Sequence, residues 1–346
     1  MKRILILIMW ILVLLTPVSA MEFTAPNAPA SAQEYMPADV DTFGDGLWHI
    51  IKTGIAKLQP NIADSLEVCV SLVSIVLLVS LLRGFDGAPK QITELVSSLL
   101  IGAILLKPSN VLIGMGVSTV KELSEYGKLL LPVMTAATAA QGGVSASTAL
   151  YLGTAFFNSF LTSIISNIIV PMIYIYLCLC VVNSAVGEDA LKKLRDFVKW
   201  LMSWTLKIVI YIFTGYMSIT GVVSGTADAA AIKATKLAIS GFIPVVGGVI
   251  SDASETVVLS AGVMKNAAGV YGLLAILSVW IGPFLQIGVQ CILLKITAAV
   301  CSIFGAKQPV DLIQSVSTGM SFVLAMTGTI CLMLLISTVC FMKGVG

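Results

Sequence analysis

The sequence predicts an all-α protein that crosses a membrane many times, a polytopic transmembrane helix bundle of about 7–10 spans, some of which can be re-entrant. Two observations predict this class. The 346 residues are 58% hydrophobic and only 11% charged, whereas a soluble domain carries roughly 25% charged residues. The apolar residues also form continuous runs of Leu, Ile, Val and Ala, which favour membrane helices over the alternating segments of a β-barrel.

The first 20 residues have the three parts of a secretory signal peptide. Lys2 and Arg3 form a basic start, Ile4–Leu15 is an apolar run, and small residues precede a cleavage point after Ala20. The apolar run is short for a spanning helix, which needs about 20 residues. We therefore expect residues 1–20 to be removed. An uncleaved membrane anchor is the alternative.

Residues 21–65 are expected to lie outside the cytoplasm. The stretch 21–46 carries three prolines, three aspartates and two glycines without a long apolar run, which predicts a flexible polar segment. The stretch 47–65 has apolar residues at helical spacing and Trp48 near its start, which predicts a helix lying along the membrane surface.

The spans begin after this segment. Residues 66–128 are expected to hold the N-terminal transmembrane helices, the first of them at Leu66–Leu82. Leu129–Val186 has no charged residue over 58 positions, too many for one crossing at about 1.5 Å per residue. We expect breaks at Gly142-Gly143 and at Pro171, and a further break near Gly282-Pro283 in the later apolar run.

Basic residues set the expected orientation. The segment Gly187–Trp200 carries Lys192, Lys193, Arg195 and Lys199 and is expected to face the cytoplasm. Its apolar residues have helical spacing, which predicts an amphipathic helix on the membrane surface. The four basic residues are the candidate docking site for a partner; a topology anchor is the plainer interpretation. An even number of spans must separate this segment from the basic loop at 83–90.

An internal duplication is a further hypothesis. Pro171 and Pro283 are 112 positions apart, as are Pro132 and Pro244, and residues 198–206 match 316–324 at an offset of 118. We therefore divide the membrane part into a first half, 129–223, and a second half, 224–346. Duplicated halves are common in transporters. The few identities can also arise by chance, since apolar sequences resemble one another.

The broken element at 241–256 is the most unusual stretch of the second half. Pro244, Gly247 and Gly248 interrupt an apolar run, and Asp252 and Glu255 follow on one helix face. The functional interpretation is a re-entrant gating or permeation element; the alternative is an ordinary loop with a helix cap.

Two glutamines later in the same half lie one turn apart. Gln286 and Gln290 are interpreted as partners in hydrogen bonds between helices.

The sequence carries no recognisable catalytic or cofactor motif. It has one histidine, His49, and seven cysteines without zinc-type spacing, which we interpret as small hydrophobes. No phosphate loop, G-x-S-x-G or H-E-x-x-H is present. We therefore expect no enzyme activity, catalytic residue, metal or cofactor. The net charge of +2 is also too small to indicate a nucleic-acid partner.

The segment from Ile239 through Gly241, Pro244, Gly248 and on to Thr256 and Gly262 resembles the stage III sporulation protein AE family of endospore-forming bacteria. The signal-like start, the polar outer segment and the many spans are also similar to that family. The resemblance covers most of residues 50–342 and is sharpest at 239–262. The N-terminal outer region is short for the family.

This resemblance implies a multi-pass protein of the mother-cell membrane around the forespore. It implies a channel-like or secretion-like complex with the other stage III sporulation A-operon proteins and a forespore-side partner. The protein would act there as a membrane platform or permease-like part, with membrane lipid as its surroundings. The family supplies no catalytic residues. A stand-alone secondary transporter of small solutes is the alternative, suggested by the duplication and the broken element.

Overall fold

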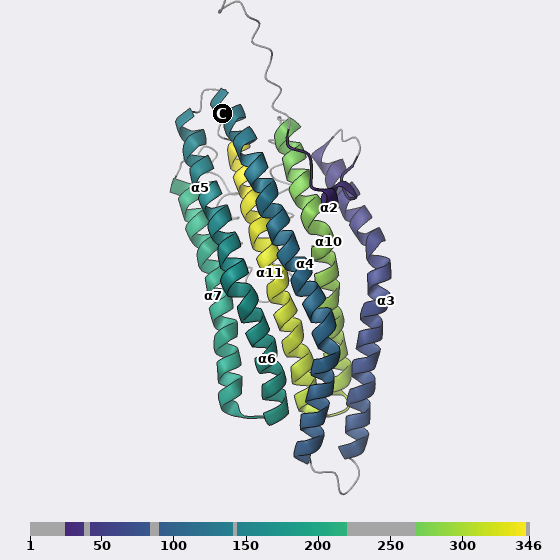
Figure 1. Cartoon of the computed structure of the whole chain (residues 1–346). Helices are drawn as coiled ribbons and strands as arrows, with labels where there is room; N and C mark the ends of the chain where they lie inside the picture. The colour runs from purple at the N-terminus through teal and green to yellow at the C-terminus, as the bar shows by residue number, and fades with distance from the viewer. Residues whose placement is uncertain (1–24, 38–41, 84–89, 141–143, 220–266, 344–346) are drawn as a thin grey trace, which may run out of the picture.

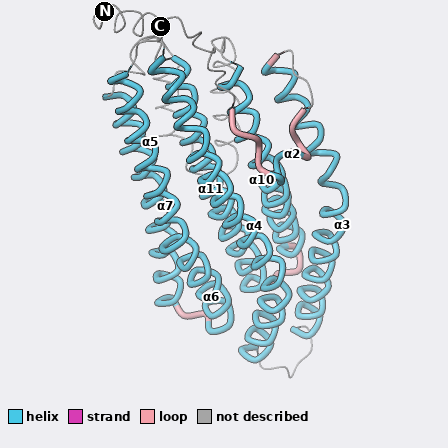
Figure 2. The backbone as a smooth tube through the Cα atoms, turned by 45° about the horizontal axis from the view of Figure 1, so that its top comes forward, coloured by secondary structure: helices cyan, strands magenta, loops and turns pink. Residues whose placement is uncertain are grey.

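The computed structural model describes residues 25–37, 42–83, 90–140, 144–219 and 267–343, and this part of the chain contains helices and short loops but no strand (Figure 2). The predicted all-α class is confirmed for these residues. Six helical stretches are long and apolar enough to cross a membrane. The signal peptide at 1–20 lies outside the described residues.

The elements follow one another in a simple up-and-down order (Figure 1). They are α2 (Ala30–Gln33), α3 (Phe43–Arg83), α4 (Lys90–Ala140), α5 (Val144–Ile164), the π-helical η1 (Ile165–Ile169), α6 (Val170–Val186), α7 (Asp189–Ile219), α10 (Ala267–Ser302) and α11 (Lys307–Lys343). With 51 residues, α4 is about 76 Å long, more than twice the roughly 30 Å hydrocarbon core of a bilayer. The long helices therefore extend well beyond a single membrane thickness.

Several expected boundaries fall inside continuous helices. The surface helix expected at 47–65 and the span expected at 66–82 are one helix, α3. The start of the first half at 129 lies within α4, which continues through Pro108 and Pro132. The break predicted near Gly282-Pro283 is wrong, because α10 runs through Pro283.

The break predicted at Pro171 is wrong as well. Helices α5 and α6 continue into one another through η1, whose wide π turn ends at Ile169 just before the proline. Proline has no N–H to donate and its ring crowds the preceding turn. A π segment absorbs this misfit without ending the helix. Only two spans, α4 and the α5–α6 rod, therefore separate the two basic segments, and this number is even as expected.

The centre of the bundle is formed by α10 and α11. Of their candidate spans 72% and 83%, respectively, are buried inside the protein, against 22% for the span of α3. Buried hydroxyls in α11 bond to carbonyls of their own helix, as Thr329 does to Ala325 at 2.7 Å and Thr338 to Leu334 at 2.8 Å. These bonds let polar residues lie in an apolar interior without an unpaired donor.

Six of the seven cysteines are buried and fit the interpretation as small hydrophobes, while Cys178 is exposed on α6.

Three helix pairs, α3–α4, α6–α7 and α10–α11, are joined at the same end of the bundle, which we call the turn end (Figure 1). Hydrogen bonds tie the pairs together there: Ser80 of α3 donates to the carbonyl of Phe304 at 2.8 Å, and Ser184 of α6 donates to the carbonyl of Gln308 at 3.0 Å. Basic residues gather near this end, namely Arg83, Lys90, Lys192, Lys193 and Lys307. Their position makes the turn end the expected cytoplasmic end.

The geometry of two turns supports the duplication. Gly187 and Gly305 both have positive φ, 77° and 70°, and both stand two residues before the next helix. They are 118 positions apart, as are the starts of α7 and α11. A left-handed residue of this kind ends a helix most easily when it is glycine. Because both turns lie at the turn end, α6 runs in the same direction as α10, and α7 runs in the same direction as α11. The two helix pairs are therefore parallel repeats and not inverted ones.

This arrangement predicts the sidedness of the chain. Alkaline phosphatase is active only outside the cytoplasm, so we expect an inactive fusion behind Glu188, at the turn end, and an active fusion behind Lys343, at the opposite end. Enzyme activity normalised to the amount of fusion protein in a bacterial host is the measurement. Active enzyme at Glu188 would show that the basic end faces outward and would overturn the orientation.

Because α4 packs closely on α11, we predict that the protein needs glycine at position 116 for full stability. A Cβ atom at Gly116 would lie 2.4 Å from Cγ1 of Val323, a branched side chain that has little freedom to move. We expect Gly116→Ala to destabilise the protein by about 1–3 kcal/mol through overpacking. Gly114→Ala on the same helix is the control, since nothing lies within 4 Å of that position, and helix propensity should then stabilise by about 0.5–1 kcal/mol. Thermal unfolding in detergent, followed by circular dichroism, should move in opposite directions for the two variants.

Candidate functional site

The four candidate docking residues lie at the start of α7 and not in a loop. Gly187 ends α6, and α7 begins two residues later at Asp189. Lys192, Lys193 and Lys199 are exposed along this first part of the helix. They present three positive charges near the turn end, whereas the fourth basic residue, Arg195, is directed elsewhere.

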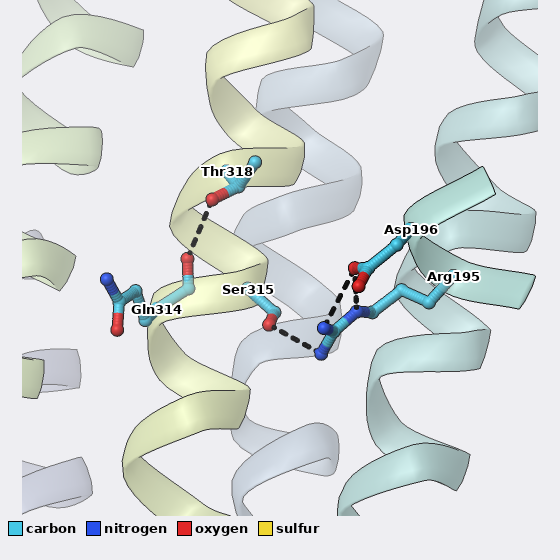
Figure 3. A network of polar contacts seen from close by, with 5 residues as sticks. All are labelled: Arg195, Asp196, Gln314, Ser315 and Thr318. Carbon is cyan, nitrogen blue, oxygen red and sulfur yellow. Dashed lines mark hydrogen bonds and ion pairs between the residues drawn. The ribbon is translucent and has the colours of Figure 1, made fainter. Parts of the chain in front are cut away.

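Arg195 points toward the neighbouring helix α11 (Figure 3). Its Nη1 donates to the hydroxyl of Ser315 at 3.3 Å, and its Nε and Nη2 donate to one carboxylate oxygen of Asp196 at 3.1 and 2.9 Å. Its side chain is 13% exposed, against 53% for that of Asp196. Arg195 therefore joins α7 to α11, and the surface available to a partner consists of the three lysines.

Sequence reasoning missed an aromatic ladder beside these lysines. Phe197, Trp200 and Trp204 stack along α7 with ring centroids 5.9 and 6.0 Å apart, and each is at least 50% exposed. The spacing of three and four residues would have placed them on one helix face. Tryptophan rings next to lysines are typical of the boundary between bilayer and water. The ladder and the lysines therefore indicate where α7 meets the membrane surface.

The candidate gating residues Pro244, Gly247, Gly248, Asp252 and Glu255 lie outside the described residues. The helices on either side of this segment, α7 and α10, have their nearest ends at the end of the bundle opposite to the turn end (Figure 1). The role of the broken element stays a prediction.

A cavity of about 440 Å³ opens between α3, α4 and α10, and we call it the lateral groove. Its charged and amide side chains come from all three helices: Asp64, Glu67, Lys107, Gln286 and Gln290. Two of its walls belong to the candidate spans Ile62–Leu82 and Ile92–Ala137. Ionisable residues within such spans are costly and mark functional sites by default.

Gln286 and Gln290 were expected to bond to neighbouring helices. In the described part of the chain neither side chain has a hydrogen-bond partner, and both line the groove. Gln290 is only 4% exposed. The expected interhelical bonds are therefore absent among these residues, and the two amide groups form part of the polar lining of the groove.

Two helix prolines line the cavities of this region. Pro108 lines the lateral groove together with Ile104, and Pro283 lines a second cavity of about 300 Å³ together with Val279. A proline cannot donate to the carbonyl four residues earlier, so the carbonyls of Ile104 and Val279 lack their helical partner. Unpaired backbone groups at membrane depth are tolerated where they line a cavity.

The N-terminal segment forms the outer wall of this second cavity. Ser31, Glu34 and Tyr35 line it, and Gln286 lines both cavities. Ser31 bonds to Glu122 of α4, and Ala28 donates to the hydroxyl of Tyr271 on α10 at 3.3 Å. The flexible segment expected at 21–46 is therefore packed on the bundle over its described part.

A charged contact also holds this segment to α3. Lys57 donates to Glu34 and lies over the ring of Tyr35, 4.8 Å from its centroid. Its hydrogen bond and positive charge lower the pKa of the Glu34 carboxyl. The contact is therefore present at neutral pH and is lost as the pH falls through this lowered pKa. Both groups are exposed, so its effect on stability is small.

The inward position of Arg195 predicts a structural role for it. Arg195→Gln removes the ion pair and the bond to Ser315, and hydrogen bonds of charged groups contribute roughly 1.5–3 kcal/mol. We expect a lower thermal unfolding temperature for Arg195→Gln and no change for Lys193→Gln, the exposed control. Equal unfolding temperatures for both variants in detergent would show that Arg195 does not join the two helices.

Comparison with known proteins and comparison with protein-family models give the same family. A curated relative, "Stage III sporulation protein AE" of Bacillus subtilis (strain 168), is 21% identical over 234 residues, which are 68% of this chain and 59% of the relative. No solved structure matches the chain. The sequence model of stage III sporulation protein AE matches residues 41–344, from just before α3 to the end of α11. The chain therefore belongs to the stage III sporulation protein AE family.

Proposed function

We propose that this protein is a non-enzymatic membrane component of a channel-like or secretion-like complex that links the mother cell and the forespore. It acts there as a membrane platform or permease-like part that supports forespore development. The observation that carries the proposal is the family match over residues 41–344, which includes all six candidate spans.

The location and partners follow from the same proposal. The protein resides in the mother-cell membrane around the forespore, with the other stage III sporulation A-operon proteins and a forespore-side protein as partners. The architecture suits a platform. Its central helices are covered by outer ones, and α3 and α4 present long exposed apolar faces that include Leu78, Leu81, Leu99 and Leu106. Such faces accommodate lipid or the helices of partner proteins.

The exposed lysines of α7 are the proposed contact with partners on the cytoplasmic side. Lys192, Lys193 and Lys199 carry positive charge at the turn end without a described acidic partner. A partner with an acidic surface would be attracted to them, and this attraction weakens with salt.

A stand-alone secondary transporter is the second candidate. The parallel arrangement of the α6–α7 and α10–α11 pairs favours it, because repeated helix units are common in transporters. The lateral groove, with charged residues in two candidate spans, supplies a polar site of the kind that a transporter needs. The two candidates differ in whether the isolated protein moves solute.

Purification from sporulating cells tests the platform. We expect the tagged protein to co-purify with its operon partners, and the triple variant Lys192→Gln, Lys193→Gln, Lys199→Gln to recover several-fold less of them, since each lost charge weakens the attraction. Lys121→Gln with Lys128→Gln is the control, because these lysines are exposed on α4 in its second half, far from the turn end. Quantitative mass spectrometry of the purified material is the measurement.

The same preparation, reconstituted alone in liposomes, separates the two candidates. A platform should leave the release of trapped small solutes at the level of empty liposomes. Solute movement by the isolated protein, together with the absence of operon partners from the purified material, would favour the transporter and contradict the platform.

A further inference from the structure

The lateral groove holds charges of both signs that do not pair with each other. Asp64 and Glu67 line it from α3, and Lys107 lines it from α4. Among the residues that the structure describes, no ion pair or hydrogen bond joins these three side chains. The two carboxylates stand three residues apart and so share one face of α3. One wall of the groove is therefore negative and the opposite wall carries a positive charge.

A buried amide marks the groove independently. Gln290 is 96% buried, being 4% exposed, and it lines the groove without a hydrogen-bond partner among the described residues. Its amide atoms keep some exposure toward the groove, where they can bond to water or to another molecule. Ile104 and Pro108 lie on the same wall as Lys107, and Pro108 has no N–H to donate to the carbonyl of Ile104. These groups can form hydrogen bonds with another molecule, and the charged side chains can pair with its charges.

We propose that the lateral groove binds a zwitterion, a molecule that carries an ammonium group and a phosphate or carboxylate group. The ammonium lies against Asp64 and Glu67, the anionic group lies against Lys107, and the amides of Gln286 and Gln290 bond to the polar atoms between them. A cation alone would leave Lys107 without a partner, and an anion alone would leave two carboxylates without one. Only a ligand with both charges pairs both walls of the groove.

Two sources supply this chemistry, and the position of the groove admits both. Its two charged walls belong to candidate membrane spans, so the headgroup of phosphatidylethanolamine can reach it from the bilayer. Its volume of about 440 Å³ also accommodates a soluble zwitterion such as phosphoethanolamine. The proposal goes beyond the sporulation role and does not depend on the partners proposed above.

The test uses the full-length protein in nanodiscs made of phosphatidylglycerol, which has no ammonium group. In one arm, phosphoethanolamine is titrated and its binding is measured by calorimetry, with ethanolamine and inorganic phosphate as half-ligands. In the other arm, phosphatidylethanolamine replaces part of the phosphatidylglycerol, and the lipid retained by the protein is measured by native mass spectrometry. The variants are Glu67→Gln, Lys107→Gln and Gln290→Leu, with Lys128→Gln on the same helix as Lys107 for the control.

We expect wild-type protein to bind the zwitterion in at least one arm and to bind each half-ligand at least tenfold more weakly. Glu67→Gln and Lys107→Gln should each weaken binding by about tenfold, the loss that accompanies one charged hydrogen bond, and Gln290→Leu by several-fold. Lys128→Gln should bind as wild type does. Thermal unfolding without ligand should be similar for Lys107→Gln and the wild type, because Lys107 is exposed and has no described partner.

Binding in the lipid arm alone identifies a phospholipid headgroup as the ligand, and binding in the soluble arm alone identifies a small solute; both outcomes support the proposal. Binding in neither arm overturns it. Binding that Glu67→Gln weakens and Lys107→Gln leaves unchanged also overturns it, because the groove would then take a simple cation. Loss of binding in Lys128→Gln to the same extent would place the ligand outside the groove.

Discussion

The pairing of backbone N–H and carbonyl groups within the chain is the constraint on which this structure depends. A bilayer offers no water to these groups, and each unpaired one costs several kcal/mol. A helix pairs them within one segment, and the described residues accordingly form long helices. The prolines show how strong the constraint is. At Pro171 the helix widens to a π turn and continues, and at Pro108 and Pro283 the helix continues beside a cavity that the proline lines.

Packing of the helices follows from a second constraint, the weak hydrophobic drive between helices surrounded by lipid. Close approach then supplies much of the attraction, and small residues permit it. Gly116, Gly127 and Gly272 lie where a Cβ atom would come within 3.0 Å of a neighbouring side chain. Hydroxyl groups at these interfaces bond mostly to carbonyls of their own helix. Ser317 is an exception, since it donates to the carbonyl of Cys291 on α10 at 2.9 Å and ties the two central helices together.

The polar residues outside this packed centre fall into two groups: side chains that bond to neighbouring parts of the protein, and side chains that have no partner among the described residues. Arg195 is held by Asp196 and Ser315, while the lysines around it are exposed. Glu34 and Lys57 hold the N-terminal segment against the bundle. The charges of the lateral groove have no such partners among the described residues. These exposed charges are therefore available to a ligand in the groove, whereas the exposed lysines at the turn end fit a protein partner.

The sequence by itself determined the helical class, the membrane location and most of the spans, because hydropathy and charge are local properties that a short window reveals. It also identified the basic start of α7 and the offset of 118 that the turns at Gly187 and Gly305 share. It placed breaks wrongly at Pro171 and Pro283, since whether a proline ends a helix depends on what fills the space beside it. Only the tertiary structure decided that Arg195 faces α11 and that Asp64, Glu67, Lys107 and Gln290 share one groove. These residues are far apart in the chain, and their meeting depends on which helices pack together, a property that no local pattern contains.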